Sequence, residues 1–136
     1  MARERKAQPI PENYLDLFEK PSLGFLGTLM PDGSPQVTPL WASYDGEYVL
    51  VNSAKGRQKD LNMRARPRVA LCMLDPYSPS RYLSIRGTVA EITTEGAVEH
   101  GAALTKRYSS KDTYTVAPGV TRVIYKILPE RVSGHG

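Results

Sequence analysis

Positive charge is concentrated in one short stretch of this 136-residue chain. Between Lys55 and Arg68 there are six basic side chains and one acidic side chain, although the whole chain carries a formal net charge of only +4. The stretch follows directly on the apolar run EYVLVNS. Such a local excess favours an anionic partner, and a phosphorylated cofactor, an acidic substrate or nucleic acid would each provide one.

The spacing of this stretch predicts a phosphate pocket at the start of a helix. Residues 57–65 can form about two turns, and Pro67 would close them. The free N–H groups and the dipole of a helix N-terminus attract phosphate. Lys59, Asn62 and Arg66 are three and seven residues apart, so they share one helix face.

The residues at the entrance of this helix suit the same chemistry. Lys55 and Arg57 supply a point charge and a fork of donors, and Gly56 allows a positive φ or a close backbone approach. Asn52 and Ser53 add short polar groups at the end of the preceding strand. A solvated basic helix covering a barrel end explains the same residues equally well. A nucleic-acid surface is a further alternative, but the eight tyrosines do not alternate with the basic residues on one strand.

The sequence offers little other side-chain chemistry. We expect His100 on an exposed helix face, His135 in the tail and Cys72 buried in the run RVALCML. Two histidines and one cysteine without paired spacing predict no metal site, and neither a GxSxG nor a Walker motif occurs. No residue stands out as catalytic, so difficult chemistry would belong to a cofactor.

Six strands and three short helices would position these residues. The turn signals PDGS and Asp45-Gly46 separate the first strands, and no alternating βαβ pattern occurs. The predicted strands are 23–30, 35–44, 47–53, 68–74, 81–92 and 121–132, and the predicted helices are 11–20, 57–65 and 93–108. The expected fold is mainly β with short helices, a small antiparallel β-barrel with helices at its ends.

Three residues predict further details of these strands and helices. Pro39 cannot donate to a ladder, so its strand lies at an edge or is interrupted there, which leaves backbone groups for a ligand. Gly87 predicts a bulge or bend in a long strand. Thr94 is a candidate N-cap for the third helix.

The length predicts one domain over residues 10–136, preceded by a flexible basic arm over residues 1–9. No apolar run approaches the roughly 20 residues that span a membrane, and the N-terminus lacks the apolar core of a signal peptide. We therefore expect a cytoplasmic protein.

Two long segments carry a resemblance to a known family. They are GFLGTLMPDGSPQVTPLWASYDGEYVLVNSAKGRQKDLNMRARPRVALCMLDP and RYLSIRGTVAEI. Together they resemble the pyridoxamine-phosphate-oxidase-like split β-barrel flavoproteins, and within them the branch that uses the deazaflavin F420. The resemblance covers residues 10–133. It implies a six-stranded split β-barrel that forms a homodimer, with cofactor sites at the subunit interface.

The resemblance also implies roles for individual residues. Arg57, Lys59 and Asn62 would hold the cofactor phosphate, with Asn52 and Ser53 beside the ribityl chain. The tricyclic ring would lie along the backbone of four residues, Gln36, Val37, Thr38 and Pro39. Two residues, Tyr82 and Arg86, would approach from the partner subunit. Trp41 would lie under the ring, at the substrate mouth or in the core. Lys55 and the basic arm, with Arg3, Arg5 and Lys6, would receive the acidic oligoglutamate tail of F420.

The implied activity is hydride transfer from reduced F420 to a conjugated, electron-poor small molecule such as a quinone, an enone or a tetrapyrrole. Tyr82 or solvent would supply the proton. FMN is the rival cofactor, because it also carries a phosphate on a ribityl arm. A non-catalytic carrier or sensor of F420 or flavin is the alternative of a different class.

Overall fold

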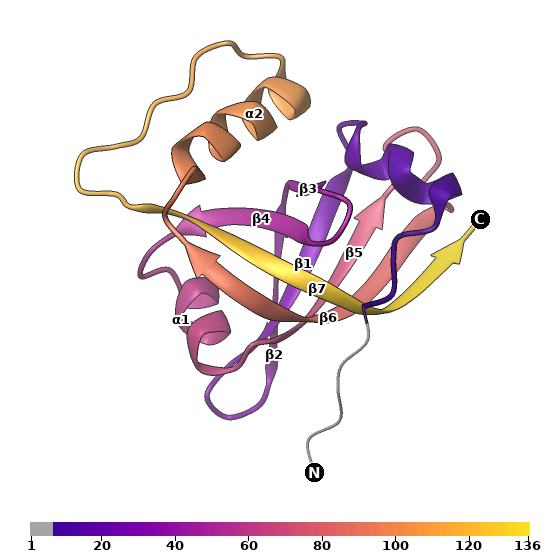
Figure 1. Cartoon of the computed structure of the whole chain (residues 1–136), viewed down its shortest axis with the longest axis horizontal. Helices are drawn as coiled ribbons and strands as arrows, with labels where there is room; N and C mark the ends of the chain where they lie inside the picture. The colour runs from indigo at the N-terminus through magenta and orange to yellow at the C-terminus, as the bar shows by residue number, and fades with distance from the viewer. Residues whose placement is uncertain (1–6) are drawn as a thin grey trace.

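A single curled antiparallel sheet forms the centre of the computed structural model, which describes residues 7–136 (Figure 1). Its seven strands are β1 (Leu23–Leu29), β2 (Pro35–Leu40), β3 (Ala42–Tyr44), β4 (Val49–Ala54), β5 (Arg68–Leu74), β6 (Tyr82–Thr93) and β7 (Arg122–His135). They lie in the order β2-β1-β5-β6-β7-β4-β3. The helices are the 3-10 helix η1 (Glu12–Phe18), α1 (Gln58–Ala65) and α2 (Ala97–Ser109).

The expected count of six strands is wrong, because the predicted strand 35–44 is two strands. β2 pairs with β1 and β3 pairs with β4, so the two halves form opposite edges of the sheet. Trp41 is the single residue between them. Pro39 lies in edge strand β2 opposite Phe25, which confirms the edge position predicted from its missing N–H.

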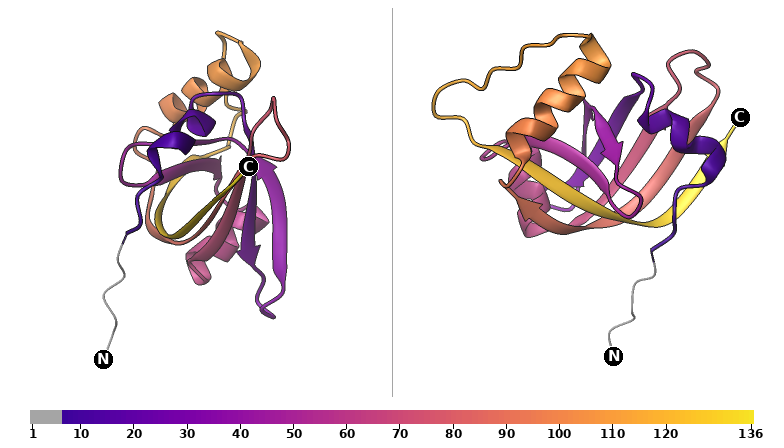
Figure 2. Two further views of the ribbon diagram at one scale, coloured as in Figure 1. Left: turned by 90° about the vertical axis from the view of Figure 1, so that its right-hand side faces the viewer. Right: turned by 45° about the horizontal axis from the view of Figure 1, so that its top comes forward.

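Strand alternation separates a closed core from an outer face. Leu26, Val51, Met73 and Ile85 are at most 1% exposed and point into the curl, together with the aromatic ring of Tyr125. Figure 2 shows the sheet from its end, where β6 and β7 bend round toward β4. These side chains come from strands that lie far apart in the sheet, and their burial against one another stabilises its curled shape.

The outer face of the sheet carries small and apolar side chains. The register places Phe25 opposite Cys72, and Cys72 opposite Ser84. A neighbouring row runs from Gly27 to Ala70 and on to Arg86. Cys72 is half-buried on this face rather than buried in the core, because it has the opposite strand parity to Leu71 and Met73.

The bend predicted at Gly87 is confirmed. The pairing of β6 with β7 shifts register between Arg86 and Gly87. A Cβ atom on Gly87 would overlap the carbonyl oxygen of Leu128, so the close strand approach requires glycine.

Helix α2 differs from its prediction at two residues. Its N-cap is Gly96, in the left-handed region with φ of 74°, so the predicted cap Thr94 is wrong. His100 is not exposed, because its helix face packs against β4 and β7. In Figure 1, α2 lies above and α1 below the paired strands β4 and β7.

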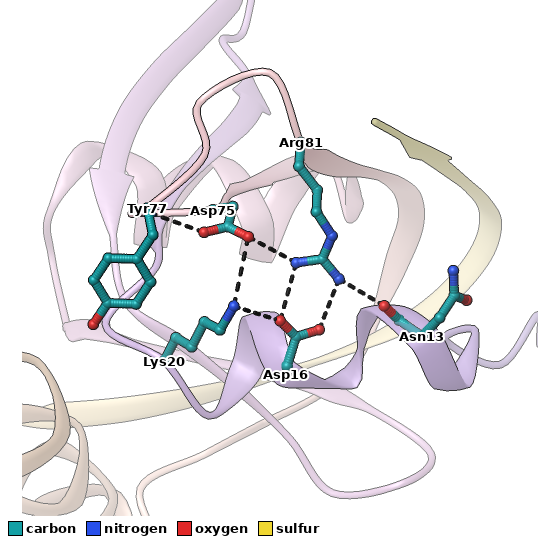
Figure 3. Close-up of polar contacts among 6 residues, drawn as sticks. All are labelled: Asn13, Asp16, Lys20, Asp75, Tyr77 and Arg81. Atoms are coloured by element: carbon teal, nitrogen blue, oxygen red, sulfur yellow. Dashed lines mark hydrogen bonds and ion pairs between the residues drawn. The ribbon is translucent and has the colours of Figure 1, made fainter.

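A group of charged side chains fastens η1 to the loop between β5 and β6 (Figure 3). Arg81 donates to both oxygens of Asp16, at 2.8 and 3.0 Å, and to Asp75 at 2.8 Å. Lys20 lies 2.8 Å from Asp16 and 3.6 Å from Asp75. Their contacts with Arg81 lower the pKa of both carboxyls, although for Asp75 the backbone N–H of Tyr77 has the larger effect.

The chain before η1 is described from Ala7 onward, so the predicted arm residues Arg3, Arg5 and Lys6 lie outside the described residues. Gln8 is fixed to β7, because its N–H donates to the Pro129 carbonyl at 2.7 Å and its side chain accepts from Val132 at 2.9 Å. Among the described residues, no helix has both the length and the apolar character to cross a membrane.

Candidate cofactor site

The loop between β4 and α1 is shaped by one buried carboxylate. Gly56 adopts a φ of +94°, and its N–H donates to Asp60 at 2.8 Å. Arg64 at 2.9 Å and the hydroxyl of Tyr125 also donate to Asp60. Burial alone would raise the pKa of Asp60, but the donors, led by Gly56, lower it overall. Asp60 is therefore ionised and holds the loop against the barrel.

This loop leaves the start of α1 open. Arg57 is the N-cap, and no side chain caps the first turn, so its N–H groups have no side-chain acceptor. Arg57 is exposed, and its side chain makes no hydrogen bond or ion pair with any of residues 7–136. The predicted helix start at the end of a strand is confirmed, within one residue.

The predicted common face of α1 packs on the hairpin of β1 and β2. The ammonium of Lys59 lies 3.5 Å from the Thr38 hydroxyl, and Arg66 donates to the Leu29 carbonyl at 2.8 Å. Asn62 lies between these residues and donates to Thr28 at 3.0 Å. The face predicted from residue spacing therefore exists and fixes the helix to the edge of the sheet.

Asn62 is completely occupied by this packing. Its amide nitrogen lies near Thr28, Met30 and Gln36, and its amide oxygen accepts from Gln58 at 2.8 Å and Arg66 at 3.3 Å. It is 0% exposed. In this arrangement Asn62 orients its neighbours and has no group left for a ligand.

Lys59 lies among cations without a carboxylate to neutralise it. Its pKa is lowered, first by burial and then by the positive charges of Arg57 and Arg122. Among the described residues it forms no ion pair. A half-buried ammonium beside two guanidinium groups is an environment that a phosphate would stabilise.

Asn52 and Ser53 point to opposite sides of β4. Ser53 is 1% exposed, and its hydroxyl has no partner among the described residues. Asn52 faces α2, where it donates to the Ala97 carbonyl at 2.8 Å and lies 3.1 Å from Nδ1 of His100. Its amide oxygen accepts two hydrogen bonds from Arg122, at 2.6 and 2.9 Å.

Two residues of this region were not expected at the site from the sequence: Arg122, which no pattern marked, and His100, which was expected on an exposed helix face. Burial lowers the pKa of His100 to about 4, and the charges of Arg107 and Arg122 add to the shift. The other ring nitrogen, Nε2, lies 2.9 Å from the Ser43 hydroxyl. His100 is therefore neutral near pH 7 and links β3, β4 and α2.

The predicted ring-binding residues form edge strand β2. Gln36 and Thr38 face α1, whereas Val37 and Pro39 are exposed on the other side. Trp41, just beyond β2, stacks on Tyr108 of α2 with ring centroids 4.9 Å apart. Trp41 thus packs on α2 in this chain.

Tyr82 and Arg86 are not brought to α1 within one chain. Tyr82 begins β6 and stacks on His135, with ring centroids 4.5 Å apart. Arg86 is opposite Arg131 and lines a surface hollow of about 370 Å³ with Ser84 and Ser133. Two arginines directly opposite each other repel, so this hollow is a second place that favours negative charge.

The described residues contain no group of three or more His, Cys, Asp or Glu side chains that could hold a metal ion. By contrast, Arg57 and Lys59 lie at the start of α1, where the backbone N–H groups have no side-chain acceptor, and the charge of Arg122 also acts on Lys59. This donor set fits an oxyanion such as a phosphate monoester.

Comparison with known proteins identifies the family of this chain. The family model described as pyridoxamine 5'-phosphate oxidase matches residues 10–136, so the chain belongs to that family. The fold is the one of this family, with seven strands here.

Solved structures share the fold over nearly the whole chain. A structure described as an F420 reductase has 38% sequence identity and a TM-score of 0.82, covering 91% of this chain and 98% of its own. The conserved hypothetical protein Rv2991 from Mycobacterium tuberculosis has 26% identity and a TM-score of 0.73, covering 98% and 89%. A Listeria innocua protein, at 22% identity, covers 90% and 95% with a TM-score of 0.70. No curated protein matches the sequence.

Proposed function

We propose that this chain is an F420-dependent oxidoreductase that transfers hydride from the reduced deazaflavin to a conjugated, electron-poor small molecule. Quinones, enones and tetrapyrroles are the substrate types of this proposal. The observation that carries it is the pair of uncompensated cations, Arg57 and Lys59, at the open N-terminus of α1. The family of the chain and its 38% identity to a structure described as an F420 reductase support a flavin or deazaflavin as the bound group.

The cofactor phosphate would lie at the first turn of α1. Arg57 and Lys59 would contact it directly, and the helix N–H groups would complete its hydrogen bonds. Asn62 would not contact the phosphate. Its hydrogen bond to Thr28 would hold α1 against the β1–β2 hairpin, where Lys59 lies near Thr38. Lys55 is exposed at the rim and would meet the acidic tail of F420, which FMN lacks.

The ring would lie along β2. An edge strand leaves backbone N–H and C=O groups on its outer side, and Val37 is 63% exposed there. Gln36 and Thr38 would fix the strand to α1, while Val37 and Pro39 would offer an apolar surface. Asn52 and Ser53 would border the ribityl arm through their backbone, because their side chains face α2 and the core.

A second copy of the chain would complete the site. The outer sheet face, with Phe25, Cys72 and Ala70, would pair the subunits in a homodimer. Tyr82 and Arg86 border this face and would then contact the cofactor bound to the partner subunit. This arrangement gives a role to two side chains that lie far from α1 in their own chain.

Bound F420 would supply the hydride, from C5 of its reduced ring. The side chains of this protein would bind the phosphate, orient the ring against β2 and exclude water from the reacting face. Tyr82 of the partner subunit or solvent would donate the proton that balances the transfer.

The first test is equilibrium binding of F420 and of FMN to the purified protein and to the double variant Arg57→Ala, Lys59→Ala. Losing charge-assisted contacts costs about 1.5–3 kcal/mol each, so the double variant should bind at least a hundredfold more weakly. Lys106→Ala is the matched control, because Lys106 is an exposed cation of α2 far along the chain from the site. Equal affinity of the double variant and the control would refute the phosphate site.

The same titration, followed by a turnover assay with reduced F420, separates the rival functions. Tighter binding of FMN than of F420 would assign the chain to FMN-dependent oxidases or reductases. Tight F420 binding without oxidation of reduced F420 by quinone, enone or tetrapyrrole acceptors would favour a carrier.

A further inference from the structure

We propose that Arg122 is a third phosphate-binding cation of this site and that Asn52, backed by His100, holds its guanidinium in place. This inference rests on the proposed function and adds residues from β7 and α2 to the binding site. It concerns a contact between segments that are 70 residues apart in the sequence.

The guanidinium of Arg122 is held by one edge and open at the other. Nε and Nη2 both donate to the amide oxygen of Asn52, at 2.9 and 2.6 Å. Nη1 makes no hydrogen bond to any of residues 7–136, and Arg122 forms no ion pair there. A guanidinium fixed in this way presents its remaining N–H groups in a defined direction, which reduces the entropy lost when an anion binds.

The amide orientation of Asn52 is determined by its other neighbours. Its nitrogen faces the carbonyl oxygen of Ala97 at 2.8 Å, and a carbonyl accepts only. The reversed amide would place an oxygen against that carbonyl and an N–H group against a guanidinium. The observed orientation is thus the one that satisfies all partners, and it directs the oxygen at Arg122.

His100 fixes Asn52 through its protonation state. The Asn52 nitrogen also lies 3.1 Å from Nδ1 of His100, which must be the acceptor because an amide nitrogen donates. The ring proton is therefore on Nε2, which donates to the Ser43 hydroxyl at 2.9 Å. The neutral ring, with its depressed pKa, is compatible with the nearby Arg122, whereas an imidazolium would lose the contact with Asn52.

The backbone places Arg122 beside the loop that opens α1. Arg122 is opposite Ala54 in the pairing of β4 with β7, and Ala54 directly precedes that loop. The Lys55 N–H donates to the Thr121 carbonyl at 2.9 Å, which extends the pairing into the loop. The positive charge of Arg122 acts on Lys59, so the two cations share one electrostatic environment.

The test compares ligands with and without a phosphate. F420 and FMN carry the phosphate on a ribityl arm, and riboflavin is FMN without it. Arg122→Met should weaken F420 and FMN binding about ten- to hundredfold and leave riboflavin binding within about twofold. Arg122→Lys, which keeps the charge but cannot make the same fork of donors, should recover only part of the loss.

His100→Ala tests the positioning role. It should weaken phosphate-dependent binding by about threefold to tenfold through loss of order in Asn52, again with riboflavin unaffected. Lys106→Met is the control for removal of an exposed cation. Urea unfolding of each variant, without ligand, confirms that it is folded at the temperature of the titration.

The outcomes distinguish failure of the Arg122 proposal from failure of the proposed phosphate site. Unchanged F420 and FMN affinity of Arg122→Met, with weakened binding by the Arg57, Lys59 double variant, would overturn this inference and leave the proposed function standing. An equal loss of riboflavin binding would show a structural role for Arg122 and would also overturn it. Failure of the double variant to affect binding would refute the phosphate site itself.

Discussion

The position of His100 was predicted wrongly, although the helical spacing of its neighbours indicates the packed face on which it lies. Ala97 and Leu104 are buried on the packed face of α2, and His100 follows Ala97 by three residues and precedes Leu104 by four. The helical spacing therefore placed the ring on the packed face. Arg122 could not be found in the same way, because its contact with Asn52 depends on the register of two strands that are distant in the sequence.

The depressed pKa of His100 predicts a pH-dependent stability. His100 titrates near 6.5 when unfolded and near 4 when folded, so between these values the unfolded chain binds more protons. Stability should fall as the pH is lowered from 7 to 4, by at most roughly 3 kcal/mol from this residue. Urea unfolding at pH 7 and pH 4.5 measures the change.

His100→Gln is the matched variant for this measurement, because glutamine is polar and does not titrate. The difference in stability between the native protein and this variant should shrink or reverse at pH 4.5. A difference that is independent of pH would contradict a buried, neutral His100.

At the scale of elements, local signals identified α1 well and the break in the second strand poorly. Gly56, the cation spacing and Pro67 are adjacent in sequence, and the helix they predict begins within one residue of its expected start. No glycine or turn signal marks Trp41. The strand divides there because the curled sheet requires β2 and β3 at opposite edges, which is a property of the tertiary structure.

The contacts of Arg81 with η1 predict that Arg81→Met lowers the thermal stability of the protein. Arg81→Met would leave Asp75, which is 4% exposed, with Lys20 as its only cation among the described residues. The melting temperature should fall by roughly 5–10 °C, because a buried carboxylate loses one of its two cationic partners. Differential scanning calorimetry measures the shift.

Lys106→Met serves as the control for this loss of charge, since Lys106 is exposed and forms no ion pair with the described residues. Arg81→Lys should recover part of the stability, because an ammonium keeps the charge but cannot bridge Asp16 and Asp75 with the same geometry. Equal melting temperatures for Arg81→Met and the control would show that the network is dispensable.

For the whole molecule, the outer sheet face predicts a dimer that one surface charge should dissociate. Ala70 is exposed between Gly27 and Arg86, so Ala70→Lys leaves the protomer fold intact and adds positive charge beside an arginine. The native protein should sediment as a dimer and this variant as a monomer. Ala103→Lys, on the exposed side of α2, should remain dimeric.

The reactivity of the Cys72 thiol is an independent test of the proposed dimer interface. Its thiol lies on this face between Phe25 and Ser84, and burial raises its pKa. Thiol labelling should be slower in the native protein than in Ala70→Lys. Dimeric Ala70→Lys with unchanged labelling would place the interface elsewhere.

The position of the last strand has a consequence for synthesis of the chain on the ribosome. β7 is the last of the seven strands to be synthesised, yet it lies between β6 and β4 in the sheet. Until it emerges, the nascent chain consists of one four-stranded piece, β2-β1-β5-β6, and one separate hairpin, β3-β4, each with an unpaired edge. Arg122 is part of β7, so the proposed set of phosphate-binding cations would also be completed last. Closure of the sheet and the proposed cofactor binding would therefore become possible at the same late moment. A chain truncated before residue 122 would leave two strand edges unpaired and would lack Arg122.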